Sequence, residues 1–198
     1  LRGAIASARG DEAAFEGHLT VASARAASLG LRLASEEILG QQGARHVECG
    51  RWKDAESALS QALRLALQDG RPRGAAVAYT SLALVDAITG RVGRARRRAR
   101  AGIRLMRAYL PRLEPYAWRV HAHALRIAGR LGAADRAARK AIDGALRFGL
   151  GVELEWCRFE YGRVRAAAGA WAEAEAVWSR ALEAAGERDG LSVAQLAI

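Results

Sequence analysis

The segment GRWKDAESALSQALRLA, residues 50–66, predicts the fold of this chain. Alanine and leucine follow Gly50 at positions 55, 58, 59, 62, 63 and 66, in alternating steps of three residues and one. This spacing places them on one stripe of an α-helix. The same offsets after Gly129 and Gly169 fall again on small or apolar residues, so the segment is one copy of a repeat.

The repeat has a period of about 40 residues. Glycine recurs at positions 10, 50, 90, 129 and 169. A small residue precedes each of these glycines by seven residues, at positions 3, 43, 83, 122 and 162. We expect it to lie opposite an alanine of the following helix, so that two backbones approach closely. Each unit is therefore predicted to be helix, glycine turn, helix. The copies after Gly10 and Gly90 are weaker, with Phe15 and Arg98 at stripe positions.

These hairpins predict an all-α fold, an α-α superhelix of about five hairpins plus the start of another helix. One hairpin cannot bury its apolar face alone, but stacked neighbours can. Residues 1–198 are interpreted as one domain, and as a piece of a longer multidomain protein because a new amphipathic pattern begins at Leu191. Helices are predicted at 1–8, 12–28, 31–48, 52–68, 73–89, 92–110, 115–128, 133–148, 152–168, 171–186 and from 191 onward. Between hairpins we expect connections at Gly30, 68–72, 111–115, 149–151 and 186–190.

GRWKDAESALSQAL, residues 50–63, resembles the second half of a tetratricopeptide repeat, and GAWAEA, residues 169–174, repeats its start. The usual period of that family is 34 residues, so the helices here are longer. With the segment ALVDAITGR, residues 83–91, the long period is similar to the helical sensor region of MalT-like, large ATP-binding LuxR-family transcriptional regulators. The resemblance implies a right-handed solenoid whose first helices line an inner, ligand-binding face. In that family a nucleotide-binding domain precedes the repeats and a helix-turn-helix domain follows them, and neither is in this sequence.

The composition is strongly basic, with a net charge of +10 and only two lysines, Lys53 and Lys140. A GC-rich coding bias explains this arginine content as readily as an anionic partner does. No apolar run is long enough to span a membrane and no secretory signal is present, which predicts a cytoplasmic protein. Cys49 and Cys157 are far apart and are predicted to be buried, reduced thiols.

Enzyme motifs are missing from the sequence. It contains no phosphate-binding loop, no His-Glu-x-x-His, no Gly-x-Ser-x-Gly and no dinucleotide fingerprint after a strand. His121 and His123 are two residues apart, so on a helix their side chains point in nearly opposite directions and cannot chelate one ion. We therefore expect a non-enzymatic protein without a cofactor or a metal.

A cluster of aromatic and basic residues is predicted on the inner face of the fourth and fifth units. If the units follow the tetratricopeptide register, the first helix of each unit lines the inner face. The residues that it would expose in the fourth and fifth units are Tyr116, Arg119, His123, Arg126, Trp156, Phe159 and Arg163. Arginine offers a planar fork to carboxylate or phosphate, and the rings offer stacking faces, so the cluster suits an anionic or aromatic ligand. Alternatively, Tyr116, Trp156 and Phe159 fill gaps between repeats.

A second candidate is a stripe of four arginines, Arg97, Arg100, Arg104 and Arg107, on the outer side of one helix. The stripe could contact the phosphates of an anionic partner. A solvated helix face explains it as well, and no aromatic residues or nucleic-acid motif accompany it. Contact with DNA is therefore expected only through other domains.

These patterns predict a ligand- or protein-binding sensor domain of a bacterial signal-responsive transcriptional regulator. Its partner would be a protein, a peptide or a small-molecule effector in the inner groove, and no membrane. Binding would change the curvature of the solenoid and so reach the attached domains. The alternative is a stand-alone interaction scaffold or a peptide-binding receptor. The oligomeric state stays open.

Overall fold

The computed structural model describes residues 12–186, which are helical almost throughout and contain no strand. The elements are α2 (Glu12–Ser28), α3 (Arg32–Glu48), α4 (Trp52–Gln68), α5 (Pro72–Ile88), α6 (Val92–Tyr109), the 3-10 turn η1 (Pro111–Leu113), α7 (Glu114–Ile127), α8 (Leu131–Arg147), α9 (Gly151–Ala167) and α10 (Trp171–Gly186). The predicted helices in this range are confirmed, with ends that differ by at most two residues. The helices predicted at 1–8 and from 191 lie outside the described residues.

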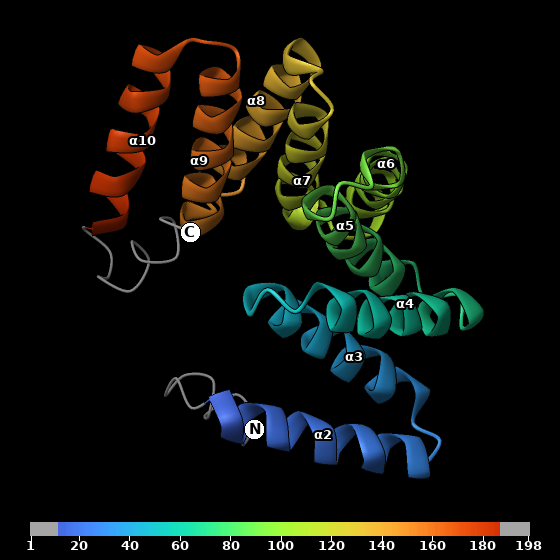
Figure 1. Cartoon of the computed structure of the whole chain (residues 1–198). Helices are drawn as coiled ribbons and strands as arrows, with labels where there is room; N and C mark the ends of the chain where they lie inside the picture. Colours follow the sequence, from blue (N-terminus) through green and yellow to red (C-terminus); the bar gives the residue numbers. More distant parts are fainter. Residues whose placement is uncertain (1–11, 187–198) are drawn as a thin grey trace.

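The helices pack as hairpins in chain order (Figure 1). In the four units whose two helices the structure describes, the helices lie against each other, and each of these hairpins contacts the next one along the chain. The first helices of neighbouring units also touch, α3 with α5, α5 with α7 and α7 with α9. We call the side formed by these first helices the inner face, and the side of α4, α6, α8 and α10 the outer face. The predicted α-α superhelix is confirmed.

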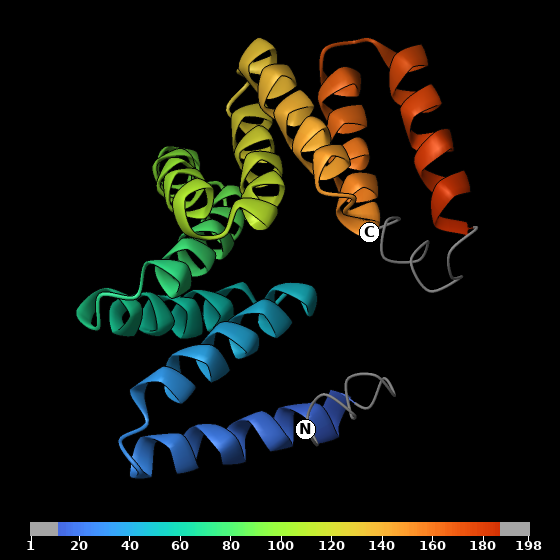
Figure 2. The same cartoon turned by 180° about the vertical axis from the view of Figure 1, so that it is seen from behind.

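The array turns as it proceeds. In Figures 1 and 2 the axes of α2, α3 and α4 run across the view, whereas those of α7, α8, α9 and α10 run up and down it. The hairpin of α5 and α6 lies between these two groups. The direction of the inner face therefore changes from one end of the array to the other.

Nearly all connections between the described helices share one geometry. In seven of them the middle residue is a glycine with φ between 62° and 81°, a region that other L-residues rarely adopt. The residue after the glycine donates its N–H to the carbonyl five residues earlier, as Arg51 does to His46 at 2.8 Å. This Schellman motif satisfies carbonyls at the helix end. Connections between hairpins, such as the one at Gly70, thus have the same geometry as those within hairpins.

The connection from α6 to α7 is the exception. It consists of Leu110 and the turn η1. Pro111 and Pro115 lack the N–H that a continuing helix needs, so a regular helix cannot run through this segment. As a result α7 has 14 residues, whereas the other described helices have 16 to 18. The helix is shorter by about one turn at its N-terminal end.

Each hairpin closes on a matched pair of residues sixteen positions apart. The pairs are Gly43 with Leu59, Ala83 with Ala99, Ala122 with Ala138, and Gly162 with Trp178. An alanine therefore lies opposite the small residue in two hairpins, as expected. In the other two the expectation is wrong, because the helix that carries glycine faces a large side chain instead.

A buried ionic network joins α4, α5 and α6. Asp86 is fully buried, and Arg91, Arg94 and Arg98 donate to its carboxylate at 2.7 to 2.8 Å. Glu56 on α4 pairs with Arg91 at 2.7 Å and with Arg94 at 2.6 Å. Arg98, which interrupts the apolar stripe in the sequence, is thus the counter-charge of a core carboxylate.

Candidate binding site on the inner face

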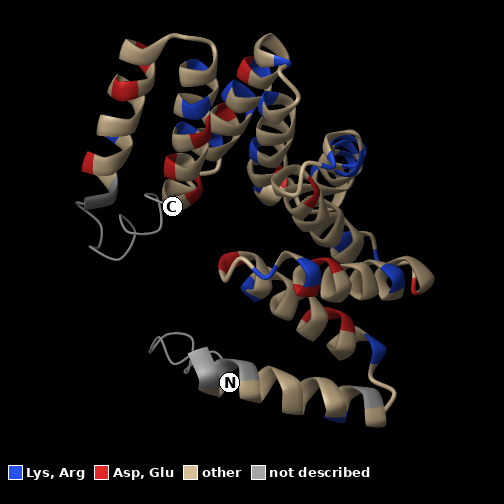
Figure 3. Ribbon diagram, viewed as in Figure 1, with Lys and Arg blue, Asp and Glu red and all other residues tan. Residues whose placement is uncertain are grey.

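The seven residues predicted for the inner face come from two first helices that touch. Four lie on α7 and three on α9. The structure brings them together in two groups, one around Arg119 and one around Glu160. We call the whole set, with Glu153 and Glu160, the inner cluster. Figure 3 shows blue segments on α7 and both blue and red segments on α9, so acidic residues accompany the predicted basic ones.

The first group centres on Arg119. Its guanidinium lies 5.1 Å from the ring centroid of Tyr116 and 5.8 Å from that of Trp156. Its Nε donates to Glu153 at 2.8 Å. Burial lowers the pKa of Arg119, but the charge and hydrogen bond of Glu153 outweigh burial and leave the pKa above its ordinary value. Arg119 is therefore a charged bridge from α7 to α9.

The second group centres on Glu160, whose side chain is almost buried. It is approached by His123 Nδ1 at 3.2 Å, Arg126 Nε at 2.8 Å and Arg163 Nη1 at 3.9 Å. Burial raises the pKa of Glu160, but the hydrogen bonds and charges of His123 and Arg126 together bring it below the ordinary value. The carboxylate therefore stays ionised and holds three basic side chains at one point.

The sequence analysis did not assign Glu153 and Glu160 to this face. Arg119 and Arg126 pair with glutamates that follow each of them by 34 residues. The arginines are seven residues apart, and so are the glutamates, which is two helical turns. Two Arg–Glu pairs with one common separation are the signal in the sequence that could have located them.

Arg163 is the cation with the weakest compensation. The inner cluster holds three arginines and two glutamates, so one positive charge is in excess before His123 is counted. Burial is the largest cause that lowers the pKa of Arg163, and repulsion from Arg126 and Arg119 adds to it against the opposing attraction of Glu160. The side chain is more than a third exposed, and its guanidinium lies 4.6 Å from the ring centroid of Phe159. The Arg163 guanidinium is therefore positioned by its neighbours and still accessible to the carboxylate of a ligand.

The aromatic residues also have packing roles. Tyr116 packs against the core beneath α5 and α6, and burial raises its pKa. The ring of Phe159 lies 6.0 Å from that of Trp178 on α10, and the Trp178 indole donates to the Phe159 carbonyl at 3.1 Å. Trp156 is half-buried. The gap-filling alternative therefore describes part of what Tyr116 and Phe159 do.

The predicted arginine stripe lies on the outer side of α6, where Figure 3 shows basic residues gathered. Arg97, Arg100, Arg104 and Arg107 are all exposed. Arg107 differs from the others because it donates to Glu114 of α7 at 2.8 and 3.0 Å. The structure thus draws one member of the stripe into contacts with the next hairpin.

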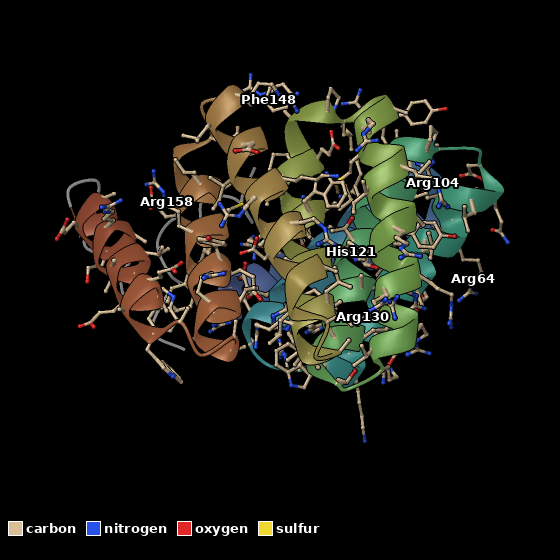
Figure 4. The ribbon with its side chains drawn as sticks, turned by 90° about the horizontal axis from the view of Figure 1, so that it is seen from above. Arg64, Arg104, His121, Arg130, Phe148 and Arg158 are labelled. Atoms are coloured by element: carbon tan, nitrogen blue, oxygen red, sulfur yellow. The ribbon has the colours of Figure 1, made fainter. Side chains whose placement is uncertain are left out.

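His121 and His123 point to different sides of α7, as their spacing predicts. His123 contacts Glu160 on the inner face, whereas His121 is buried toward α6 and its ring lies 6.1 Å from that of Trp118 (Figure 4). The Nδ1 atom of His121 has no hydrogen-bond partner among the described residues. Burial, followed by the charges of Arg100 and Arg96, lowers the pKa of His121 from 6.5 to about 4.

Acidification is therefore expected to destabilise the protein through His121. Below pH 6.5 this histidine binds a proton in the unfolded chain, whereas in the folded chain it does so only near pH 4. The stability that is present at neutral pH is therefore lost as the pH falls across this window. Between pH 7 and pH 5.5 the contribution is about 1 kcal/mol. Urea unfolding at both pH values measures it. His121→Leu should reduce the difference by that amount, and an equal reduction in His18→Gln would contradict this assignment.

The two cysteines differ in exposure. Cys157 is buried, and burial raises the pKa of its thiol. Cys49 is exposed, so the prediction that both cysteines are buried is wrong for Cys49.

Within residues 12–186 no three His, Cys, Asp or Glu side chains are arranged to hold a metal ion. None of the described helices is long and apolar enough to cross a bilayer.

Comparison with known proteins places the fold only. No family model matches the chain, and no curated protein matches it. Among solved structures, BtubC (BKLC) from P. vanneervenii is similar, with a TM-score of 0.73 and 17% sequence identity over 95% of this chain and 78% of that chain. The likeness supports a helical array along nearly the whole length of the chain.

Proposed function

We propose that this chain is a non-enzymatic binding domain of the tetratricopeptide-like kind, which holds an acidic segment of a protein or peptide on its inner face. In the wider setting that the MalT-like resemblance implies, it is the sensor region of a bacterial signal-responsive transcriptional regulator. The period of 39 to 40 residues and the contacts among α3, α5, α7 and α9 support the repeat type.

The proposal rests on Arg163, whose charge is incompletely compensated and whose side chain is partly exposed. Glu160 is shared among three basic side chains, and Arg163 is the most distant of them at 3.9 Å. A carboxylate from a ligand can accept two parallel hydrogen bonds from its guanidinium. It would also compensate the excess positive charge of the inner cluster. The half-buried ring of Trp156, two helical turns before Arg163 on α9, offers an apolar contact to the same ligand.

An extended segment suits this surface better than an enclosed small molecule. The described residues form two cavities away from this surface. One is lined by residues of α6, α7 and α8 and the other by residues of α8 and α9, and no residue of the inner cluster lines either cavity. The inner cluster is instead a face shared by two parallel-running first helices. A ligand that contacts both would bias their relative position and hence the curvature of the array.

The proposal is tested by peptide binding. Fluorescein-labelled random nonapeptides with a fixed central Asp-Glu pair are compared with a pool in which the pair is Asn-Gln, using fluorescence anisotropy. The acidic pool should bind more tightly, and Arg163→Gln should weaken its binding about tenfold. Arg158→Gln is the matched control, since Arg158 pairs with Glu155 and lies on the opposite side of α9. Equal binding of both pools, or equal loss in both variants, would refute the proposal.

The sensor role predicts a further measurable change. Small-angle scattering of the protein with saturating acidic peptide should show an altered profile, because the curvature shifts on binding. An unchanged profile with retained binding would favour the alternative of a constitutive scaffold or peptide receptor. Both alternatives use the same inner face.

A further inference from the structure

A cavity of about 310 Å³ opens on the outer face between α6, α7 and α8. Its polar walls are Arg107, Glu114, Trp118, Lys140, Asp143 and Arg147. In Figure 4, Arg104 on α6 and Phe148 just after α8 mark the two helices that flank it. No residue of the inner cluster lines this cavity.

The cavity exists because α7 is about one turn shorter than the other described helices. The first turn that α7 lacks would lie between the C-terminal halves of α6 and α8. Arg107 comes from the last turn of α6, and Lys140, Asp143 and Arg147 come from the second half of α8. The floor is close-packed, since a Cβ atom on Gly144 would lie 2.9 Å from Pro115 Cγ.

One wall of the cavity is held rigidly by Glu114. Its Oε1 accepts hydrogen bonds from Arg107 Nε at 3.0 Å, Arg107 Nη2 at 2.8 Å and Trp118 Nε1 at 2.9 Å. These bonds fix the orientation of the indole ring. They also leave the charge of Glu114 compensated by Arg107.

The other wall carries two cations that form no ion pair with the described residues. Lys140 and Arg147 are exposed and seven residues apart, so they lie on the same side of α8. The Lys140 ammonium lies 4.5 Å from the ring centroid of Trp118, and no ion pair joins Lys140 or Arg147 to a carboxylate of the described residues. Asp143 is the only acidic residue on this wall. The cavity therefore combines an excess positive charge with an aromatic ring.

We propose that this outer cavity binds a small molecule that carries a phosphate group. Lys140 and Arg147 contact the phosphate, and Trp118 packs against the apolar part of the ligand. A phosphate monoester is close to a dianion at neutral pH and can satisfy both cations, whereas a carboxylate satisfies one. The volume is at the lower end of the range for small-molecule sites. The site is separate from the inner face and does not depend on the function proposed for it.

Phenyl phosphate, inorganic phosphate and benzoate are suitable probes. Titration is followed by isothermal calorimetry and by the indole N–H signal of Trp118 in ¹H–¹⁵N spectra, which is assigned from its loss in Trp118→Phe. Phenyl phosphate should bind more tightly than either other probe and should shift the Trp118 signal. Binding of benzoate with equal affinity, or no binding of phenyl phosphate, would overturn the proposal.

Two double variants separate a built site from general basicity. Lys140→Gln/Arg147→Gln should weaken phenyl phosphate binding at least tenfold. Arg97→Gln/Arg104→Gln removes the same charge from exposed positions outside the cavity and should change the affinity less than twofold. Equal losses in the two double variants would overturn the proposal. Peptide binding by the inner face should be the same in both, so a failure here is distinguishable from a failure of the proposed function.

Discussion

Asp86→Asn is expected to lower the free energy of unfolding by about 3 kcal/mol, the lower end of the cost of breaking a buried ion pair. The carboxylate is fully buried, and three arginines donate to it from 2.7 to 2.8 Å. An amide of the same shape presents N–H groups to these donors and removes their counter-charge. The arginines keep partial access to water, which limits the loss. Urea unfolding followed by circular dichroism at 222 nm measures it.

Glu56→Gln is the matched control for Asp86→Asn. Glu56 pairs with Arg91 and Arg94, two of the arginines that Asp86 binds, but its side chain is 29% exposed. Partly exposed pairs contribute about 1 kcal/mol or less. If both variants lose the same free energy, burial of Asp86 is not what makes the network important.

Gly43→Ala is expected to destabilise the protein by about 2 kcal/mol, although alanine favours helix more than glycine does. The added Cβ would overlap Cγ and Cδ2 of Leu59. Leu59→Ala leaves a cavity in a fully buried position and should cost about 3 kcal/mol. Both changes together reproduce the Ala83–Ala99 pair of the next hairpin. The double variant should therefore lose at least about 1 kcal/mol less than the sum of the single losses.

The double-mutant cycle is measured by urea unfolding of all four proteins. Gly40→Ala is a control on the same helix, since a Cβ there meets nothing within 4 Å. It should be neutral or stabilising. Additive losses in the cycle would show that the glycine and the leucine are not matched to each other.

Much of the fold follows from the sequence because its causes are local. The stripe after Gly50 determines one face of α4, and a glycine with positive φ ends a helix wherever it occurs in a row of good helix formers. These signals gave helix ends within two residues. The shortening of α7 follows from Pro111 and Pro115, but the resulting cavity depends on how α6 and α8 pack around the gap.

The candidate sites are less accessible from the sequence because their causes are not local. The register placed Arg119, His123, Arg126 and Arg163 on one face, and the structure brings them together. Which acid compensates each arginine depends on the offset between α7 and α9, so Glu153 and Glu160 were missed. The partner of Arg98 could not be predicted either, because it depends on how α5 and α6 pack. In the sequence Arg98 only interrupts the apolar stripe, whereas in the structure it pairs with Asp86.

The gradual change in helix direction along the array limits the shape of any molecule that follows the whole inner side. A straight, rigid rod such as a long helix can lie along only a few neighbouring hairpins before the surface turns away from it (Figure 2). A binder that reaches from α3 to α9 has to bend with the array or be unstructured before it arrives. Short linear motifs in flexible tails meet that requirement without strain.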